Sequence, residues 1–398
     1  MEDLYNYQNN LLNQVSLYWK RYLYPKLVPQ EKLLGIKGLR GVGKTTLLLQ
    51  YLLSSPLEIQ QKLYVTADHP YFYSSSLFEL ASQFYAYSGK LLVIDEVHKY
   101  ANWSRELKLI YDEFSDLKVL FTSSSALDLY RGESDLSRRL ITLNLEGLSF
   151  REYLNLTSGK NFNKVKLEDI LANHKELSQA ITADFHPLPD FKRYLKQGYL
   201  PAIAQVEESS MKMRTFQTIN TVLETDLAFS KEYSPANIAK IKKLLGVIAV
   251  TVPFEPNISK IAEKLGIGRN TVYAFLAHLQ EAKILNLANK PKKGINYLQK
   301  PDKIYFENTN FTFALQENPS VGTIRETFFL NQVKNSGHTV NLSTQGDFLI
   351  DERWTFEIGG PSKDSGQLKS SADGFLAMDE MEIGFAKKIP LWLFGFLY

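Results

Sequence analysis

The sequence Gly38-Leu39-Arg40-Gly41-Val42-Gly43-Lys44-Thr45 matches the motif G-x-x-x-x-G-K-[ST] of phosphate-binding loops. An apolar run, Leu33–Lys37, precedes the loop, and Lys44–Ser54, with apolar residues at helical spacing, follows it. Glycines let the backbone approach a phosphate closely, so that successive N–H groups and the helix N-terminus point at negative charge. We therefore predict a nucleotide site at residues 38–46, with Thr46 as its last member. A glycine-rich turn without a ligand is the alternative.

The loop and a later strand together supply the side chains that nucleotide hydrolysis needs. Lys44 is expected to reach the β- and γ-phosphates, and the hydroxyl of Thr45 is expected to ligate Mg²⁺. The apolar run Leu91–Ile94 ends in Asp95 and Glu96. We predict that Asp95 holds Mg²⁺ and that Glu96 activates water for in-line attack on the γ-phosphate. Without the loop, the same residues would be read as an ordinary strand end.

Short apolar runs alternate with amphipathic runs through the first 150 residues. This alternation predicts an α/β fold, with a parallel sheet covered by helices on both faces. The strands expected besides Leu33–Lys37 are Lys62–Thr66, Leu91–Asp95, Lys118–Thr122 and Arg139–Leu145. The helices expected besides Lys44–Ser54 are Ser76–Ser88 and Trp103–Ser115.

Hydroxyl and arginine side chains follow the fourth of these strands. The strand Lys118–Thr122 runs into Ser123 and Ser124, at the sheet edge where the phosphates are expected. Either serine is a candidate sensor of the γ-phosphate, and a serine-rich helix cap is the alternative. Arg138 and Arg139 come next, as a candidate finger toward the nucleotide of a neighbouring subunit or as a solvated pair.

Several of these segments resemble one group of proteins. The chain is similar to prokaryotic AAA-type ATPases that carry a C-terminal domain of unknown function with a restriction-nuclease-like core. The segments that carry the resemblance are Val93–Lys99 with Asn102-Trp103, Phe121–Ser125, Leu136–Arg139 and Leu148–Leu154. The resemblance implies a P-loop NTPase of the AAA/ASCE type that binds and hydrolyses ATP with Mg²⁺.

The resemblance also assigns roles to single residues. It places Lys44, Thr45, Asp95 and Glu96 on the nucleotide site and Ser123 near the sensor position. Arg139 falls on the arginine that follows Leu-x-Gly in these proteins, and Arg138 stands in place of that glycine. Asp68 matches their acidic position after the second strand, with a structural or Mg²⁺-shell role. His98 gives Asp-Glu-Val-His a helicase-like look, which we interpret as coincidence.

The region Ile258–Leu287 has the pattern of two or three compact helices, including a helix-turn-helix. Gly266 allows the turn, and the apolar residues on either side pack the two helices together. Arg269, Asn270 and Tyr273 start the second helix, where contacts to DNA bases or phosphates are made. A β-wing is expected to follow, with the basic residues Lys290, Lys292 and Lys293. A purely structural winged helix is the alternative to DNA binding.

The last part of the chain contains the acidic residues of a restriction-type nuclease site. Glu326, Asp347 and Glu357 are the candidate carboxylates for Mg²⁺. The lysine expected two residues after Glu357 is absent, because Gly359-Gly360 stand there. Lys363 or Lys369 would need an unusual chain path to replace it. We therefore expect a small α/β domain, with a restriction-nuclease-like core that is inactive.

The composition limits the remaining possibilities. The 398 residues suffice for two to three domains, and a net charge of +3 excludes a strongly cationic coat for nucleic acid. No cysteine is present, which excludes disulfide scaffolds, thiol nucleophiles and cysteine metal sites. The polar, acidic N-terminus and the lack of a long apolar run predict a cytoplasmic protein outside the membrane.

We predict four parts and three competing functions. The parts are a P-loop ATPase domain (1–150), a helical lid or linker (151–245), a winged helix (246–300) and the nuclease-like domain (301–398), which ends in a buried strand at Pro390–Tyr398. The leading function is an Mg²⁺-dependent ATPase, with possible homo-oligomerisation, whose nucleotide state moves the other domains on nucleic acid. The alternatives are an ATP-gated DNA-binding regulator without significant turnover and a metal-dependent nuclease.

Overall fold

The computed structural model describes residues 1–27, 31–123, 136, 138–251, 255–291, 300–363 and 373–398. The chain divides into two compact units, Met1–Glu146 and Gly147–Tyr398, which we call unit 1 and unit 2. The predicted division of residues 151–398 into three parts stays a prediction. None of the helices within the described ranges has both the length and the apolar character needed to cross a membrane.

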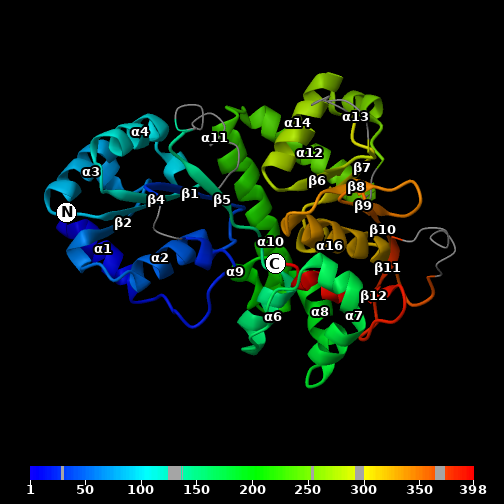
Figure 1. Cartoon of the computed structure of the whole chain (residues 1–398). Coiled ribbons are helices and arrows are strands. Elements are labelled where there is room, and N and C mark those ends of the chain that lie inside the picture. The colour runs from blue at the N-terminus through cyan, green and yellow to red at the C-terminus, as the bar shows by residue number, and fades with distance from the viewer. Residues whose placement is uncertain (28–30, 124–135, 137, 252–254, 292–299, 364–372) are drawn as a thin grey trace. The chain divides into compact units, whose positions relative to one another are not determined.

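Unit 1 is an α/β unit built on a parallel sheet of five strands, as predicted (Figure 1). Its strands are β1 (Leu33–Lys37), β2 (Lys62–Thr66), β3 (Leu91–Asp95), β4 (Lys118–Ser123) and β5 (Ile141–Asn144), in the order β2-β3-β4-β1-β5. Its helices are α1 (Glu2–Leu12), α2 (Lys44–Ser54), α3 (Leu77–Ala86) and α4 (Trp103–Glu113), with 3-10 turns η1 (Tyr24–Lys26), η2 (Ile59–Gln61), η3 (Pro70–Tyr73) and η4 (Val97–Lys99).

Helices cover both faces of this sheet, because its central strands have apolar residues pointing to both sides. Alternate residues of β3 and β4, such as Ile94 and Phe121, pack in one cluster with Leu80 of α3 and Leu107 of α4. The helix α2 contacts β2, β3 and β4, and Figure 1 shows it on the side of the strands away from α3 and α4. Burial on both faces explains why the central strands could be recognised in the sequence as short, mainly apolar runs.

The strand order gathers the predicted site at one edge of the sheet. β1 lies between β4 and β5, and β3 lies next to β4. In this register Ile36 is level with Thr122, and Thr66 is level with Asp95. Since all five strands are parallel, the loop after β1 and the ends of β3 and β4 meet at the carboxyl edge.

Unit 2 begins with helices and ends with a mixed sheet. Its helices are α6 (Phe150–Ser158), α7 (Leu167–Thr182), α8 (Pro187–Gln197), α9 (Pro201–Ala204), α10 (Glu208–Thr221), η5 (Val222–Leu227, a π-helix), α11 (Ala228–Ser230), α12 (Pro235–Thr251), α13 (Ile258–Leu265), α14 (Arg269–Glu281), α15 (Thr309–Leu315), α16 (Val321–Asn335) and the 3-10 helix η6 (Leu391–Phe396). Its strands are β6 (Leu285–Ala288), β7 (Lys303–Phe306), β8 (Val340–Leu342), β9 (Phe348–Ile350), β10 (Trp354–Gly359), β11 (Gly374–Met378) and β12 (Lys388–Pro390).

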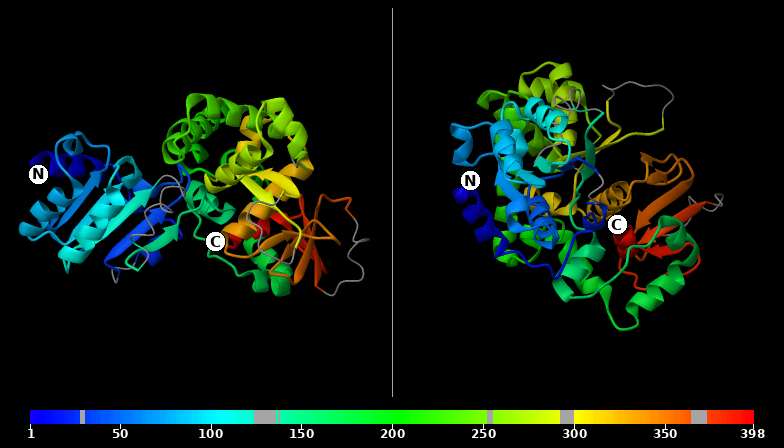
Figure 2. Two further views of the ribbon diagram at one scale, coloured as in Figure 1. Left: turned by 90° about the horizontal axis from the view of Figure 1, so that it is seen from above. Right: turned by 60° about the vertical axis from the view of Figure 1, so that its left-hand side comes forward.

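The strands of unit 2 form two sheets. β6 and β7 are an antiparallel pair, so the end of the region predicted as helical, Leu285–Leu287, is a strand. The C-terminal sheet has the order β12-β11-β10-β9-β8, and its orange-to-red strands lie side by side in Figure 2. β12, β11 and β10 are parallel, whereas β10, β9 and β8 are antiparallel.

The predicted strand at Pro390–Tyr398 is wrong. The chain leaves β12 at Pro390 and forms the 3-10 helix η6, in which every residue is buried. A Cβ on Gly395 would lie 2.4 Å from the Cβ of Phe150, so η6 packs closely against α6. A short run that is apolar on all sides has no period, and periodicity therefore cannot separate a buried strand from a buried helix.

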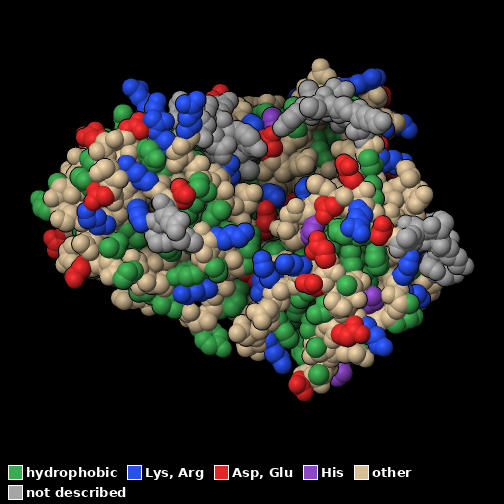
Figure 3. All heavy atoms as spheres, in the orientation of Figure 1, with side chains coloured by type: hydrophobic (Ala, Val, Ile, Leu, Met, Phe, Trp, Pro, Cys, Tyr) green, Lys and Arg blue, Asp and Glu red, His purple; other side chains and the backbone are tan. Residues whose placement is uncertain are grey.

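Charged side chains of both signs lie on the face shown in Figure 3. Lys and Arg side chains are interspersed there with Asp and Glu. This mixture is consistent with the small net charge of +3.

Candidate nucleotide site

The loop between β1 and α2 has a backbone that requires glycine at three positions. Gly41 and Gly43 have φ angles of 83° and 92°, in the left-handed region that side chains rarely adopt. At Gly38 the requirement is space, because a Cβ there would lie 2.3 Å from the carbonyl oxygen of Leu145. The loop is thereby folded tightly between β1 and the end of β5.

The N-terminus of α2 fits an anion. No side chain caps its N-cap residue, Gly43, and its first turn contains no acidic residue. The N–H groups of this turn and the positive end of the helix dipole are thus suited to a negatively charged ligand. Lys44 is buried, and its Nζ donates to the carbonyl oxygens of Gly38 (2.8 Å) and Leu39 (3.0 Å). Its ammonium group is therefore held on the loop where a phosphate would lie.

Asp95 is the centre of the hydrogen-bond network under the loop. It ends β3, with 3% of its surface exposed. Its Oδ2 accepts hydrogen bonds from the hydroxyls of Thr45 (2.6 Å) and Tyr64 (2.9 Å). Its Oδ1 accepts from the hydroxyl of Thr122 and from the backbone N–H of Glu96 (3.1 Å). The two predicted Mg²⁺ ligands, Thr45 and Asp95, are therefore in direct contact.

Glu96 lies among cations. Its backbone is left-handed, with a φ of 50°, and its N–H donates to Thr122 Oγ1 at 2.9 Å. One carboxylate oxygen is ion-paired with Lys99, and the other lies 3.9 Å from an Nη of Arg40 in the loop. A left-handed non-glycine residue is uncommon, and such residues cluster at functional sites. The carboxylate predicted to activate water thus stands beside the loop.

Asp68 belongs to the same group of charges. Its Oδ2 is ion-paired with Lys99, and its Oδ1 accepts from Thr66 Oγ1 at 2.5 Å. Burial acts to raise the pKa of Asp68, but its hydrogen bonds with Lys99 and Thr66 outweigh burial and lower that pKa. Of the two roles considered for Asp68, its contacts support the structural one.

Two neutral groups border the carboxylates. Burial, and then the charge of Asp95, raises the pKa of Tyr64, which stays a hydrogen-bond donor at any ordinary pH. Burial also lowers the pKa of His98 to about 3, and the nearby cations of Lys44 and Lys99 act in the same direction. His98 is therefore a neutral, buried residue of η4.

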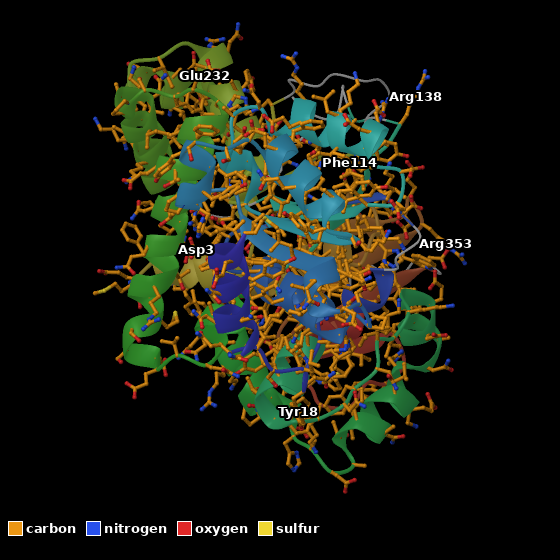
Figure 4. The ribbon with its side chains drawn as sticks, turned by 90° about the vertical axis from the view of Figure 1, so that its left-hand side faces the viewer. Asp3, Tyr18, Phe114, Arg138, Glu232 and Arg353 are labelled. Atoms are coloured by element: carbon orange, nitrogen blue, oxygen red, sulfur yellow. The ribbon has the colours of Figure 1, made fainter. Side chains whose placement is uncertain are left out.

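The predicted sensor and finger residues have different surroundings. Ser123 is fully buried at the end of β4, level with Lys37 of β1, while Ser124 lies outside the described residues. Arg139 makes a bidentate ion pair with Asp112 of α4, with Nε–Oδ1 and Nη2–Oδ2 distances of 2.8 and 3.1 Å. Arg138 is exposed at the margin of unit 1, where its side chain extends outward (Figure 4).

Several residues of the site were given no role from the sequence. Tyr64 and Thr122 contact Asp95, and Lys99 contacts Glu96. Buried Arg21 donates to the carbonyl oxygen of Val42 inside the loop. The position of Thr122 at the end of the strand beside β3 could have indicated that it lies near Asp95. The following serines, Ser123 and Ser124, are instead the sensor candidates predicted from the sequence.

The helix-turn-helix residues lie as predicted along α13 and α14. Gly266 has a φ of 62° and ends α13, whose apolar face is buried. Arg269 and Asn270 are exposed in the first turn of α14, and Tyr273 is half-buried. The strands β6 and β7 follow as an antiparallel pair; of the predicted wing lysines, Lys290 is described, whereas Lys292 and Lys293 lie outside the described residues.

The C-terminal carboxylates gather beside a lysine. Glu326 is largely buried, and its burial, together with the charges of Asp347 and Glu357, raises its pKa against the opposing hydrogen bond from Tyr305. Lys363 Nζ lies 2.6 Å from Glu357 Oε1. The chain therefore follows the unusual path that would let Lys363 replace the missing lysine. A tight turn explains this, since a Cβ on Gly359 would lie 2.5 Å from that of Lys363. Lys369 lies outside the described residues.

The acidic cluster nevertheless lacks the geometry of a multi-carboxylate metal site. Over the described parts of the chain, no three or more His, Asp or Glu side chains are arranged to hold a metal ion. Tyr305 donates to Glu326 at 2.6 Å, and the Ile358 N–H donates to Asp347 at 2.7 Å. These carboxylates are thus engaged by the protein itself.

Two family models match the chain. Residues 30–154 match a family described as an AAA domain, which spans the loop, Asp95, Glu96 and Arg139. Residues 188–320 match a domain of unknown function. The second match covers α8 to α15 and ends before the C-terminal sheet, so a restriction-nuclease-like core has no support from it.

Individual proteins are similar over longer stretches. An uncharacterized protein of Methanocaldococcus jannaschii is 25% identical over 390 residues, which cover 90% of this chain and 82% of that protein. A Walker-type ATPase of Pyrococcus abyssi is 13% identical with a TM-score of 0.43, covering 75% of this chain and 96% of that one. The Aeropyrum pernix Orc1 protein, solved in complex with DNA, is 15% identical with a TM-score of 0.33, covering 77% and 91%.

Unit 1 therefore carries an AAA-type P-loop ATPase domain. Unit 2 carries the domain of unknown function and, after it, the mixed sheet.

Proposed function

We propose that the protein is an Mg²⁺-dependent ATPase that converts ATP and water to ADP and phosphate. The observation that carries the proposal is the 2.6 Å contact between Thr45 and Asp95, beneath an uncapped helix N-terminus. A hydroxyl and a carboxylate are oxygen ligands that suit Mg²⁺. Residues 38–46 hold the phosphates, with the N–H groups of the loop and the ammonium of Lys44 directed at them.

The proposed roles divide between metal ligands and a base. When bound, Mg²⁺ neutralises charge on the β- and γ-phosphate oxygens. Thr45 and Asp95 hold the metal ion, and Lys44 stabilises charge on the transferred group. Glu96 accepts a proton from the attacking water, and Ser123 lies at the sensor position at the end of β4.

Nucleotide binding and turnover of three variants test this assignment. Lys44→Ala is expected to lose ATP binding, because it removes the cation of the loop. Glu96→Gln is expected to bind ATP but to hydrolyse it at least about a hundredfold more slowly, the range typical of a lost general base. Lys26→Ala, an exposed lysine of unit 1, is the control and should match the wild type. Equal ATP affinity in the wild type and Lys44→Ala would refute the site.

DNA is the second proposed partner, and nucleotide state would govern its binding. The supporting observation is the exposure of Arg269 and Asn270 in the first turn of α14, beside Tyr273, where helix-turn-helix proteins contact DNA. Gel shifts at low salt, with and without ATP, test this. Loss of binding in Arg269→Ala but not in the exposed-lysine control Lys212→Ala supports it. If DNA binding responds to ATP while turnover is negligible, the protein is an ATP-gated regulator instead.

Assembly into a homo-oligomer is a further part of the proposal. Arg139 would have to exchange Asp112 for the nucleotide of a neighbouring copy to act as a finger. Sizing of the ATP-bound Glu96→Gln protein tests this. An increase in mass that Arg139→Ala abolishes supports a shared site, and a monomer under all conditions contradicts it.

For the C-terminal sheet we propose a restriction-nuclease-like core that has lost cleavage. The contact of Lys363 with Glu357 supports the relationship, and the engaged carboxylates support inactivity. Plasmid DNA incubated with Mg²⁺ or Mn²⁺ should remain uncut. Cleavage that disappears in Glu357→Gln would make the protein a metal-dependent nuclease.

A further inference from the structure

The segment between α1 and β1 is fastened along α2. We call residues 13–27 the strap. Gln50 of α2 is buried, and its Nε2 donates to two strap carbonyl oxygens, those of Ser16 (2.8 Å) and Trp19 (2.7 Å). Lys20 Nζ lies 3.9 Å from the centre of the Tyr24 ring, within the strap itself. The strap therefore follows the helix that begins at the phosphate loop.

Arg21 of the strap joins two backbone segments. Only 3% of its surface is exposed. One of its Nη atoms donates to the carbonyl oxygen of Val42 in the loop, and the other donates to that of Glu146 at 2.7 Å. Glu146 ends unit 1, shortly after β5. Burying a guanidinium is costly unless it is well hydrogen-bonded, and its bonds to carbonyl oxygens are charge-assisted.

The bond to Val42 fixes the direction of the next peptide group. In a trans peptide the C=O and the following N–H point in opposite directions. With the Val42 carbonyl held on Arg21, the N–H of Gly43 lies in the same peptide plane and points away from Arg21. Gly43 is the N-cap of α2, so this N–H belongs to the set that faces a phosphate.

The hydrogen bond to the carbonyl oxygen of Glu146 connects the Arg21 guanidinium to the end of unit 1. Tyr22 strengthens it, because its hydroxyl donates to the carbonyl of Asn144 (2.9 Å) and accepts from the N–H of Glu146 (3.2 Å). The chain continues from Glu146 directly into unit 2, where the Leu148 N–H donates to the carbonyl of Tyr199 at 2.7 Å. The Arg21 guanidinium thus connects the loop peptide to the last residue of unit 1 through two hydrogen bonds.

We propose that Arg21 is a positioning residue that sets the phosphate loop for nucleotide and couples loop occupancy to residues 144–146. This inference rests on the proposed ATPase function. No sequence motif predicts this role for the strap. Arg21 acts through the loop backbone and through the Glu146 carbonyl, without contact with the reacting atoms.

The test compares Arg21→Met, Arg21→Lys and the control Lys20→Met. The ammonium of Lys20 lies in the same strap and contacts Tyr24 and Ser54. Loss of two charge-assisted bonds should weaken binding of a non-hydrolysable ATP analogue at least about tenfold in Arg21→Met. Arg21→Lys keeps a cation but cannot span both carbonyls, and an intermediate loss is expected. Lys20→Met should bind as the wild type does.

Hydrogen exchange distinguishes coupling through Arg21 from a purely structural role of this residue. In the wild type, the analogue should slow exchange in peptides that cover residues 141–151. At saturating analogue, Arg21→Met should bind but lose this protection. If Arg21→Met does not fold, Arg21→Lys decides. A folded Arg21 variant with wild-type affinity and protection overturns the inference while the ATPase function stands, whereas a wild type that binds no analogue overturns both.

Discussion

The hydroxyl of Thr45 lies 2.6 Å from Oδ2 of Asp95, although the two residues are 50 positions apart in the chain. Thr45 is fixed by the start of α2 and Asp95 by the end of β3, and both elements are buried against the sheet. The hydroxyls of Tyr64 and Thr122 hold the same carboxylate from β2 and β4. Three strands and one helix therefore hold the two proposed Mg²⁺ ligands in place, which would reduce the ordering that metal binding requires.

Asp95→Asn is expected to weaken activation by Mg²⁺. The change keeps the size of the side chain but removes the charge that attracts the metal ion. We expect the Mg²⁺ concentration for half-maximal turnover to rise by about 10- to 100-fold. Titration of ATPase activity with Mg²⁺ measures it. Tyr64→Phe is the matched control, because it removes one hydrogen bond to Asp95 and leaves the ligand in place; an equal effect in both variants would mean that the charge is unimportant.

Lys99→Met is expected to raise turnover. Lys99 holds the carboxylate of Glu96, which our assignment makes the base, and it also holds Asp68. The pair is partly exposed, so its energy is about 1 kcal/mol, which corresponds to about fivefold in rate. Steady-state kinetics should show this rise in kcat with an unchanged KM for ATP. A fall in kcat would instead show that Lys99 positions Glu96 for catalysis.

The nucleotide loop could be predicted because its requirements are local. Gly41 and Gly43 have left-handed backbone, and the strands Leu33–Lys37 and Leu91–Asp95 are apolar up to their last residue, because both sheet faces are covered. The prediction of a parallel α/β sheet followed from the alternation of such runs with helical segments, whereas its P-loop type came from the motif at residues 38–45 and from the family resemblance.

The partners around the loop could not be predicted in the same way. The register of the sheet brings Tyr64 to Asp95, the turn η4 brings Lys99 to Glu96, and the path of the strap brings Arg21 to the loop. None of these features produces a repeating pattern of apolar residues in the sequence. The sequence does not predict Lys363 as a partner of Glu357, because the two residues are six positions apart and the turn at Gly359 that brings them together has no sequence motif. Through-space contacts of this kind depend on the complete fold.

Two glycine-to-alanine changes should have opposite effects. In Gly38→Ala the new Cβ would lie 2.3 Å from a backbone oxygen, and backbone cannot move aside cheaply. We expect a loss of about 1–3 kcal/mol in the free energy of unfolding of unit 1, with weaker ATP binding. Gly246→Ala adds a methyl group in open space inside α12 and should stabilise that helix by about 1 kcal/mol. Hydrogen exchange in β1 and α12 peptides measures each locally; stabilisation by Gly38→Ala would contradict the observed packing.

His98 should make unit 1 sensitive to acid. Burial holds the pKa of His98 at about 3 in the native state, whereas the ordinary value is 6.5. Between these values the unfolded chain binds a proton that the native state does not bind. The free energy of unfolding therefore falls as the pH drops below 6.5, by up to about 1.4 kcal/mol per pH unit, and is unaffected by this group above 6.5.

Replacing His98 should flatten that dependence. In His98→Gln no imidazole remains to be protonated, so the slope of stability between pH 6.5 and 4 should decrease even if the variant is less stable at neutral pH. Hydrogen exchange of β3 peptides across this range isolates unit 1 from the rest of the chain. His186→Gln is the control, because the side chain of His186 is 80% exposed and belongs to unit 2. An unchanged acid slope in His98→Gln would mean that the buried imidazole is protonated in the native state, and the neutral surroundings assigned to η4 would then be wrong.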